Sequence, residues 1–324
     1  MPFRFQAVRR TTLLALTLAL AGVGTAHAEQ RVIRIVVPYG TGAVQDTIAR
    51  AISDELGQAL NASIVVENRA GAGGTVGTSQ VARATPDGNT MVLAAASHNI
   101  AGYLYKNLSY DPYKDFTGVA YLGNTGYIIL ASAGLQVKNT AEFIQAVKAK
   151  PGAYDYASAG NGSASHLGMA SFLTAAGVQM QHIPMKSTGD AVTELLAGRV
   201  QAVTAATIGV TAYRNDPRVT FLAYTGKTRS RFATDLPTVA ESGLPGYAFD
   251  SWLGLLAPAG LPSAERAKIN AAVNKVLADP KVQARLASLG VEAEAKSPEQ
   301  FQDLLKADWE AAGKLVAASG ARVE

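Results

Sequence analysis

The chain has 324 residues, of which 48% are hydrophobic, and its 29 lysines and arginines slightly outnumber its 25 aspartates and glutamates. A chain of this length suggests two domains. The sequence contains no cysteine, which excludes disulfide bonds and thiolate chemistry. Its charges are close to balanced, so nothing indicates the clustered basic face of a nucleic-acid-binding protein.

The N-terminus has the organisation of a secretory signal. Three arginines within the first ten residues precede an apolar run over 11–24, which is too short to span a membrane comfortably. An A-x-A cleavage signature then ends at Ala28. We therefore predict a signal peptide over 1–28, and a membrane-anchoring helix is the alternative. Removing this segment, which has three arginines and no acidic residue, leaves 26 basic and 25 acidic side chains.

Strands and helices alternate in the first part of the predicted mature chain. A β-branched run over 31–39 predicts a strand, and Ile48, Ile52, Leu56 and Leu60 repeat every fourth residue in a predicted amphipathic helix. The next predicted elements are a strand, a short helix and a strand, over 63–68, 75–84 and 90–96. Such alternation favours right-handed crossovers and a mainly parallel sheet.

The same pattern restarts after about residue 130. Helices are predicted over 141–150, 163–177 and 190–198, and strands over 154–160, 181–185, 200–206 and 219–226. A loop rich in Gly, Pro and Ser follows, and then an extended segment over 247–258. The chain finishes with helical patterns over 263–280, 281–290 and 298–320.

Two α/β units followed by a helical tail indicate a two-lobed α/β fold with two mixed, mainly parallel sheets. A tail of this kind usually packs on the first unit, so the chain would cross twice between lobes, near Ile128–Ser132 and Phe249–Leu253. These crossings are predicted to be hinge strands. We assign 29–130 plus 251–324 to lobe 1 and 131–250 to lobe 2.

The first strand-to-helix turn, PYGTGAVQDTIAR, is suited to an anion. Its glycine-containing backbone exposes N–H groups where the dipole of the following helix is positive. Thr41 and Gln45 can add donors, and Asp46 is well placed to cap the helix. The alternative is a simple turn that binds no ligand.

The stretch SAGNGSASHL forms a second turn of this kind. Gly160 and Gly162 permit close backbone approach, and Ser163 or Ser165 can begin the following helix. His166 would lie in its first turn, where the dipole disfavours the charged imidazole. No serine in the chain has the G-x-S-x-G context of a nucleophile elbow. An exported hydrolase using Ser163 or Ser165 with a histidine remains the alternative.

Other motifs give no sign of a cofactor or metal. The glycines of RAGAGGTVG, residues 69–77, do not fit G-x-G-x-x-G because Val76 stands at a required glycine position. Close backbone packing or a pocket edge is the better interpretation. His98, His166 and His182 lack the spacing of a local zinc pair.

Several segments together resemble the periplasmic solute receptors of tripartite tricarboxylate transporters, the Bug family. They are ENRAGAGG, VARATPDG, DPYKDF, YASAGNGSASHL, PTVAESGLPGY and WLGLLAPAGLP, and the resemblance covers nearly all of the mature chain. It implies a periplasmic, non-catalytic receptor with a cleft between two α/β domains, which delivers its ligand to a membrane permease. It also implies that the two turns clasp one ligand carboxylate with the help of ordered water.

The chain departs from the family pattern at three places. The first loop, usually P-F-x-P-G-G-x-T-D, matches at Gly42 and Asp46 but not at Ala43, Val44 and Gln45. The segment after His182 reads Pro-Met-Lys-Ser rather than P-Y-K-G, and residues 201–207 lack the usual aspartate–phenylalanine pair. These changes favour an organic acid with an apolar or aromatic body, and a polar di- or tricarboxylate is the alternative.

The predicted ligand contacts lie at strand ends in both lobes. They are Tyr39, Thr41, Gly42, Ala43, Asp46, Ser97 and Asn99 in lobe 1, and Ser158, Gly160, Asn161, Ser163, His166 and Thr207 in lobe 2. Tyr39 would supply a ring wall, the hydroxyls donors and the glycines unobstructed amides, while Asp46 would brace its loop. We expect a monomer whose partner is a permease, or alternatively a sensor kinase.

Overall fold

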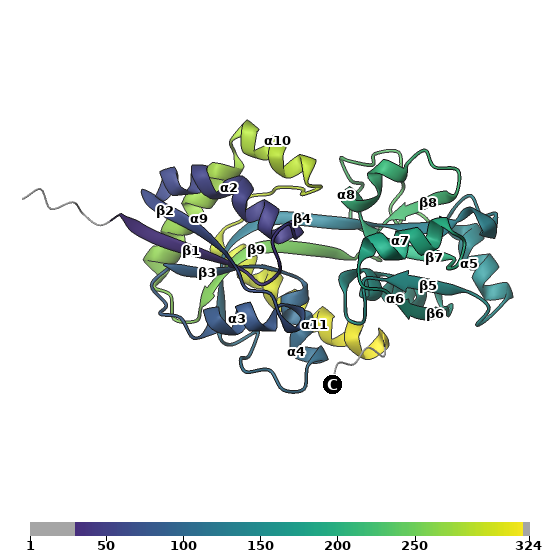
Figure 1. Cartoon of the computed structure of the whole chain (residues 1–324), viewed down its shortest axis with the longest axis horizontal. Coiled ribbons are helices and arrows are strands. Elements are labelled where there is room, and N and C mark those ends of the chain that lie inside the picture. The colour runs from purple at the N-terminus through teal and green to yellow at the C-terminus, as the bar shows by residue number, and fades with distance from the viewer. Residues whose placement is uncertain (1–29, 320–324) are drawn as a thin grey trace, which may run out of the picture. The chain divides into compact units, whose positions relative to one another are not determined.

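The computed structural model describes residues 30–319 (Figure 1). The predicted signal peptide over 1–28 lies outside this range. Within the described part of the chain, no helix is both long enough and apolar enough to cross a membrane.

The first elements alternate as the sequence predicts. They are β1 (Arg31–Val37), α2 (Val44–Leu60), β2 (Ala62–Asn68), η1 (Ala72–Gly74), α3 (Thr75–Ala82), β3 (Thr90–Ala95) and α4 (Ser97–Leu104). Strands β1 and β3 are parallel neighbours. The sequence did not indicate α4, which begins two residues after the end of β3.

Strand β4 (Phe116–Ser132) runs through both halves of the sheet. Its first part, Phe116–Gly126, pairs with β9 (Asp250–Pro258), and from Tyr127 onward it pairs with β7 and β8 instead. The order is β2-β1-β3-β9-β4-β7-β5-β6, with β8 also on β4. We call β2, β1, β3, β9 and the part of β4 up to Gly126 the first sheet. The part of β4 from Tyr127, with β7, β8, β5 and β6, is the second sheet.

The second sheet again alternates with helices. Its elements are η2 (Ala133–Leu135), α5 (Thr140–Ala149), β5 (Asp155–Ser158), α6 (Ala164–Ala176), β6 (Gln181–Pro184), α7 (Thr188–Leu196), β7 (Ala202–Ala206), α8 (Thr207–Val210), η3 (Thr211–Tyr213) and β8 (Val219–Tyr224). Strand β5 is parallel to both β6 and β7.

The sheets are mixed, as expected, but the pairs made by β4 and β9 are all antiparallel. The expectation of mainly parallel sheets was too simple because the long strands β4 and β9 run in opposite directions side by side. The parallel pairs flank this antiparallel centre.

The C-terminal helices are α9 (Ser263–Leu277), α10 (Pro280–Ser288) and α11 (Pro298–Ser319). Helices α9 and α10 pack on α2, and α11 packs on β4 and α4, which agrees with a helical tail on the first sheet. Helix α11 also reaches α6 beside the second sheet, where Ala312 and Val316 join the same apolar cluster as Phe172.

The apolar stripe predicted for α2 faces the core. Ile48, Ile52 and Leu56 are fully buried, and they pack with Ile33 and Ile35 of β1. Burying a side chain of this size contributes about 1.5–3 kcal/mol relative to leaving it in water. This cluster fixes the start of α2 relative to the end of β1, and therefore the loop between them.

A short backbone contact holds β4 where it nears the second sheet. Asn124 and Glu292 exchange two backbone hydrogen bonds, with N···O distances of 3.2 and 2.9 Å. The preceding Gly123 has a φ of +143°, and a Cβ atom on it would lie 2.4 Å from the carbonyl oxygen of Glu292. Only glycine fits here without moving the backbone.

We predict that Gly123→Ala lowers the free energy of unfolding by about 3 kcal/mol, because the added methyl group would collide with rigid backbone rather than a flexible side chain. The matched control is Gly209→Ala, since nothing lies within 4 Å of a Cβ there. Urea denaturation of both variants checks this. Equal stabilities would show that the Glu292 segment yields easily.

Candidate functional site

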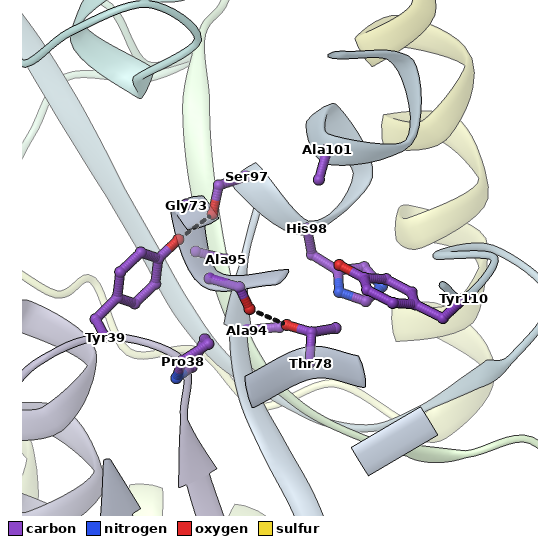
Figure 2. A pocket seen from close by; sticks show the side chains of 11 residues that line it. Pro38, Tyr39, Gly73, Thr78, Ala94, Ala95, Ser97, His98, Ala101 and Tyr110 are labelled. Carbon is purple, nitrogen blue, oxygen red and sulfur yellow. Dashed lines mark hydrogen bonds between the residues drawn. The ribbon is translucent and has the colours of Figure 1, made fainter. Parts of the chain in front are cut away.

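Tyr39, two residues after β1, lines a small cavity with groups from η1, α3, β3 and α4 (Figure 2). Its hydroxyl group lies 2.9 Å from Ser97 Oγ at the start of α4. Thr78, His98 and Tyr110 complete the polar lining, and the cavity volume of about 10 Å³ matches a single water molecule. Burial raises the pKa of Tyr39, so its hydroxyl stays protonated.

The glycine-rich segment at 69–77 forms the edge of this cavity, as its sequence suggested. A Cβ atom on Gly74 would lie 3.3 Å from the Tyr39 ring, and one on Gly73 would lie 2.3 Å from the Tyr105 hydroxyl. Both glycines also have positive φ angles. Side chains at these positions would push the two tyrosines out of place.

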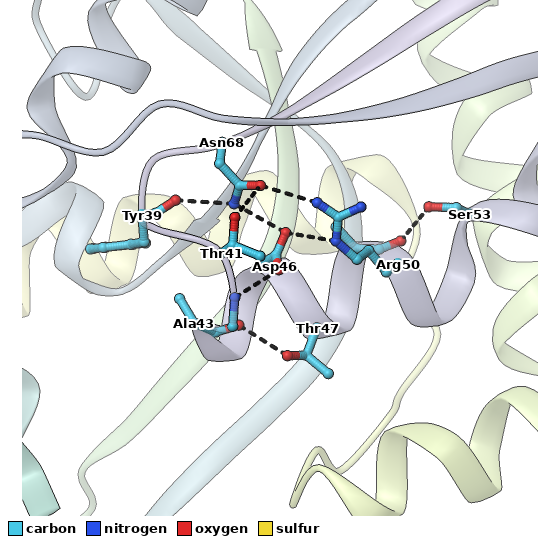
Figure 3. A network of polar contacts seen from close by, with 10 residues as sticks. Tyr39, Thr41, Ala43, Asp46, Thr47, Arg50, Ser53 and Asn68 are labelled. Carbon is cyan, nitrogen blue, oxygen red and sulfur yellow. Dashed lines mark hydrogen bonds and ion pairs between the residues drawn. The ribbon is translucent and has the colours of Figure 1, made fainter.

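Asp46 braces the loop between β1 and α2 (Figure 3). Its carboxylate accepts hydrogen bonds from Gly42 N at 2.9 Å, Arg50 Nε at 2.9 Å and Asn68 Nδ2 at 3.0 Å. Burial alone would raise the pKa of Asp46, but these hydrogen bonds together lower it. Asp46 therefore stays ionised, and its charge is used within the loop, as the sequence predicted.

Two details of the first loop differ from expectation. The N-cap position of α2 is Ala43, and Asp46 lies in the first helical turn rather than capping from outside. The Gly42 amide is not free to bind a ligand, because it donates to Asp46. The Ala43 amide likewise donates to Gly40 O at 3.1 Å. The amides without an acceptor among the described residues include those of the exposed Gly40 and Thr41 and of the first turn of α2, as is usual at helix starts.

The second loop, between β5 and α6, is built by its own side chains. Ser163 is the N-cap of α6 and accepts from His166 N at 3.2 Å, as predicted for a serine here. Gly160 and Gly162 have φ angles of +107° and +73°. Their amides donate to Ser158 Oγ and His166 Nδ1, both at 3.1 Å, so they too are already bonded.

The backbone N–H groups of this loop that remain unbonded are those of other residues. Asn161 is exposed, and its amide and those of Ala164 and Ser165 at the start of α6 have no acceptor among the described residues. The glycine amides are already bonded in both loops for the same physical reason. In each loop a nearby side chain folds back and accepts from a glycine amide, and amides at the start of the following helix stay unbonded.

His166 is buried against a histidine that the sequence did not single out. The rings of His166 and His182 stack with centroids 3.9 Å apart and planes within 8°. Burial, together with the neighbouring His182, lowers the pKa of His166 to about 4, and burial lowers the pKa of His182. Both rings are therefore neutral at pH 7. The sequence feature that could have indicated His182 is its position in the predicted strand β6, whose parallel register places it opposite Tyr156 of β5.

The serines of this loop do not form the predicted hydrolase pair. Ser163 Oγ and Ser165 Oγ lie 3.0 Å from each other, and Ser165 Oγ accepts from Ala159 N at 2.9 Å. The serine that contacts a histidine is Ser158, whose Oγ is 2.6 Å from His182 Nε2. Ser158 is fully buried, so this contact ties β5 to β6 rather than presenting a nucleophile.

Two predicted contact residues have other roles. Asn99 is buried, and its Nδ2 donates to Leu305 O and Asp308 Oδ2 of α11 at 3.1 and 2.7 Å. Thr207 is also buried, and its hydroxyl donates to Gly126 O at 3.0 Å, where β4 changes partners. Asn99 therefore anchors α11 and Thr207 fastens β4, so both are removed from the candidate site.

Helix α4 links the two loops. Ser97 at its start contacts Tyr39, and Leu104 at its end lies against the second loop, where a Cβ on Gly162 would be 2.2 Å from its Cδ2 atom. These two residues are about 10 Å apart along the helix axis. The candidate site consists of the two loops and this helix. Among residues 30–319, no cluster of three or more His, Asp or Glu side chains is placed to hold a metal ion.

We predict that the protein loses stability as the pH falls from about 7 to about 4. Unfolded histidines take up protons near pH 6.5, whereas folded His166 remains neutral down to about pH 4. This residue alone should remove roughly 3 kcal/mol over that interval. His166→Asn retains an acceptor for the Gly162 amide and should flatten the pH profile of urea denaturation. An unchanged slope would contradict the assignment.

Comparisons with known proteins identify the family of the chain. The sequence pattern described as "Tripartite tricarboxylate transporter family receptor" matches residues 48–321. The UPF0065 protein from the tcbD–tcbE intergenic region of Pseudomonas sp. (strain P51) is 32% identical over 317 residues, covering 95% of this chain and 94% of that protein.

Solved structures of similar proteins are two-lobed binding proteins. The periplasmic binding protein BugD is 34% identical with a TM-score of 0.74, covering 90% of this chain and 98% of BugD. MatC from Rhodopseudomonas palustris with bound malate is 32% identical, with a TM-score of 0.73 and coverages of 88% and 99%. Rpa4515 with adipate, from R. palustris, is 28% identical, with a TM-score of 0.78 and coverages of 91% and 100%.

These proteins are solute receptors rather than enzymes, which removes the hydrolase alternative, and receptors of this family are periplasmic. The match spans most of the chain and includes the second loop of the candidate site, whereas the first loop, at 38–43, precedes it. The chain therefore belongs to the tripartite tricarboxylate transporter receptor family, the Bug proteins, and has their two-lobed solute-binding fold.

Proposed function

We propose that the two loops of this receptor close on the carboxylate of one small organic acid. The observation that carries the proposal is the pair of helix starts, α2 and α6, each with unbonded first-turn amides beside a polar loop, together with helix α4, which contacts both loops. Helix N-termini attract anions through these amides and through the helix dipole.

No cationic side chain is needed for this mode of binding. Each charge-assisted hydrogen bond contributes about 1.5–3 kcal/mol net. A few of them can hold a small acid with roughly micromolar affinity after the cost of association. The hydroxyls of Thr41 and Ser163 add donors, and the ring of Tyr39 forms a wall. His166 and His182 support the second loop as neutral rings.

The ligand class follows from the relatives and from the differences between them and this chain. Structures of similar proteins contain malate or adipate, both dicarboxylic acids. Ala43 and Val44 add apolar surface at the first loop, beside the aromatic ring of Tyr39. We therefore propose an acid with an apolar or aromatic body, with a polar di- or tricarboxylate as the alternative.

The remaining parts of the proposal concern the cellular role. Cleavage after Ala28 would release the receptor into the periplasm, where the family implies delivery to the permease of a tripartite transporter. We place the lobes at 29–130 plus 251–324 and at 131–250, with closure about β4 and β9. The backbone of β4 changes partners between Gly126 and Tyr127, which supports a hinge there.

We predict that Ser163→Asp abolishes carboxylate binding, because the new charge would repel the ligand at the start of α6. Aspartate is as good an N-cap as serine, so the fold should persist. Isothermal titration with adipate, malate and benzoate measures the effect, after thermal shift has identified which of them the unmodified protein binds.

Ser187→Asp is the matched control, since Ser187 caps α7 in the same way and accepts from Asp190 N at 3.1 Å. It adds the same charge outside the candidate site and should leave the affinity unchanged. Binding that survives Ser163→Asp would remove the second loop from the site.

A further inference from the structure

A second cavity, separate from the proposed carboxylate site, lies between helices α4, α6 and α11 and the start of β9. Its volume is about 480 Å³, which is within the range of pockets for small molecules. Its walls are mainly apolar and include Ile100, Phe249 and Leu315. Ser171 and Thr174 of α6 contribute hydroxyls.

The faces of α4 separate this cavity from the candidate site. Ser97 and Ala101, four residues apart, line the small cavity beside Tyr39, whereas Ala96 and Ile100 line the larger one. Residues four apart share a helix face, and neighbouring residues are turned by about 100°. A molecule in the larger cavity would therefore not occupy the carboxylate site.

The charged groups in the wall are mostly acidic. Asp250 and Asp308 line the cavity, and neither makes an ion pair with a lysine or arginine of the described chain. Asp308 Oδ2 accepts from Trp252 Nε1 at 2.9 Å and Asn99 Nδ2 at 2.7 Å, and both of these donors are neutral. The one basic residue in the lining is the exposed Lys314.

The burial of these carboxylates has an electrostatic consequence. Burial raises the pKa of Asp308, and burial also raises that of Asp250 to about 6, so Asp250 is mostly ionised at pH 7. Both residues are half-buried, and a carboxylate that is partly removed from water without a cationic partner is destabilised, so a bound cation would supply that partner. Perturbed acids in an apolar pocket also mark candidate binding sites in general.

We infer that this cavity is a second ligand site, which takes a small organic ammonium ion with an apolar chain. The ammonium group would lie beside Asp308 and Asp250, and the chain would lie against Ile100, Phe249 and Leu315. Charge complementarity selects a cation, and the apolar walls select an alkyl or aryl body over a bare metal ion.

The test uses hexylammonium chloride and the indole N–H signals of the protein in ¹H–¹⁵N NMR spectra. Trp252 reports on the site because its indole donates to Asp308. Trp309, which packs on Tyr103 and Tyr113, is an internal reference, and a Trp309→Phe variant assigns the two signals. We expect hexylammonium to shift the Trp252 signal saturably, with half-saturation near about 1 mM, an ordinary strength for about seven non-hydrogen atoms.

Two variants locate the bound ion. Asp308→Asn keeps an oxygen acceptor for Trp252 and Asn99 but removes the charge, and should weaken binding about tenfold. Asp303→Asn makes the same change on the exposed face of α11 and should have no effect. Ala175→Trp places a large ring in the cavity from an exposed position and should abolish the shift.

Neutral hexanol separates charge recognition from simple apolar binding. We expect it to bind at least tenfold more weakly than hexylammonium. Equal binding of the two, no saturable shift up to about 10 mM, or full binding by Asp308→Asn would overturn the inference. None of these results depends on whether the loops bind a carboxylate, which the Ser163→Asp titration tests separately.

Discussion

The antiparallel ladder between β4 and β9 is the constraint on which the rest of the structure depends. It joins the sheets into one hydrogen-bonded path, and it keeps the ends of β1 and β5 in a defined relation. Glycines allow the close packing around it. A Cβ on Gly254 would lie 2.3 Å from the Phe301 ring, and one on Gly126 would lie 1.9 Å from the Tyr224 hydroxyl. Both loops of the candidate site inherit their positions from this ladder.

In the proposed binding mode, the candidate site recognises a charged ligand with neutral groups. The carboxylate that braces the first loop, Asp46, already accepts hydrogen bonds from Arg50, Asn68 and the Gly42 amide. In the second loop, His166 and His182 are held neutral by burial. The field that an anion meets therefore comes from backbone amides at two helix starts, and these need no reorganisation when the ligand arrives. The loop side chains act by fixing the direction of those amides.

Local sequence patterns predicted the features that depend on neighbours in the chain. The four-residue repeat of α2 and the Ser163 cap of α6 were confirmed because helix periodicity and capping are short-range. Other features depend on distant residues. The Asn99 amide is taken by α11, more than two hundred residues later, and His182 reaches His166 only through the β5–β6 register. The direction of β9 was likewise not readable from its own apolar run, which suits a parallel or an antiparallel strand.

Helix α4 has two faces with opposite electrostatic surroundings. On one face, Ser97 contacts Tyr39 beside the amide-rich loops, and on the other, Ile100 faces a cavity with two carboxylates. The lining of the larger cavity includes Ala96, which packs with the first sheet, and Ile100, which packs with the second, so the proposed closure about β4 would change its shape. An occupant that fits one arrangement better would shift the equilibrium between arrangements. By linkage, the carboxylate ligand and an ammonium ion would then change each other's affinity by the same factor, and the sign would depend on whether closure opens or narrows the cavity beside α11.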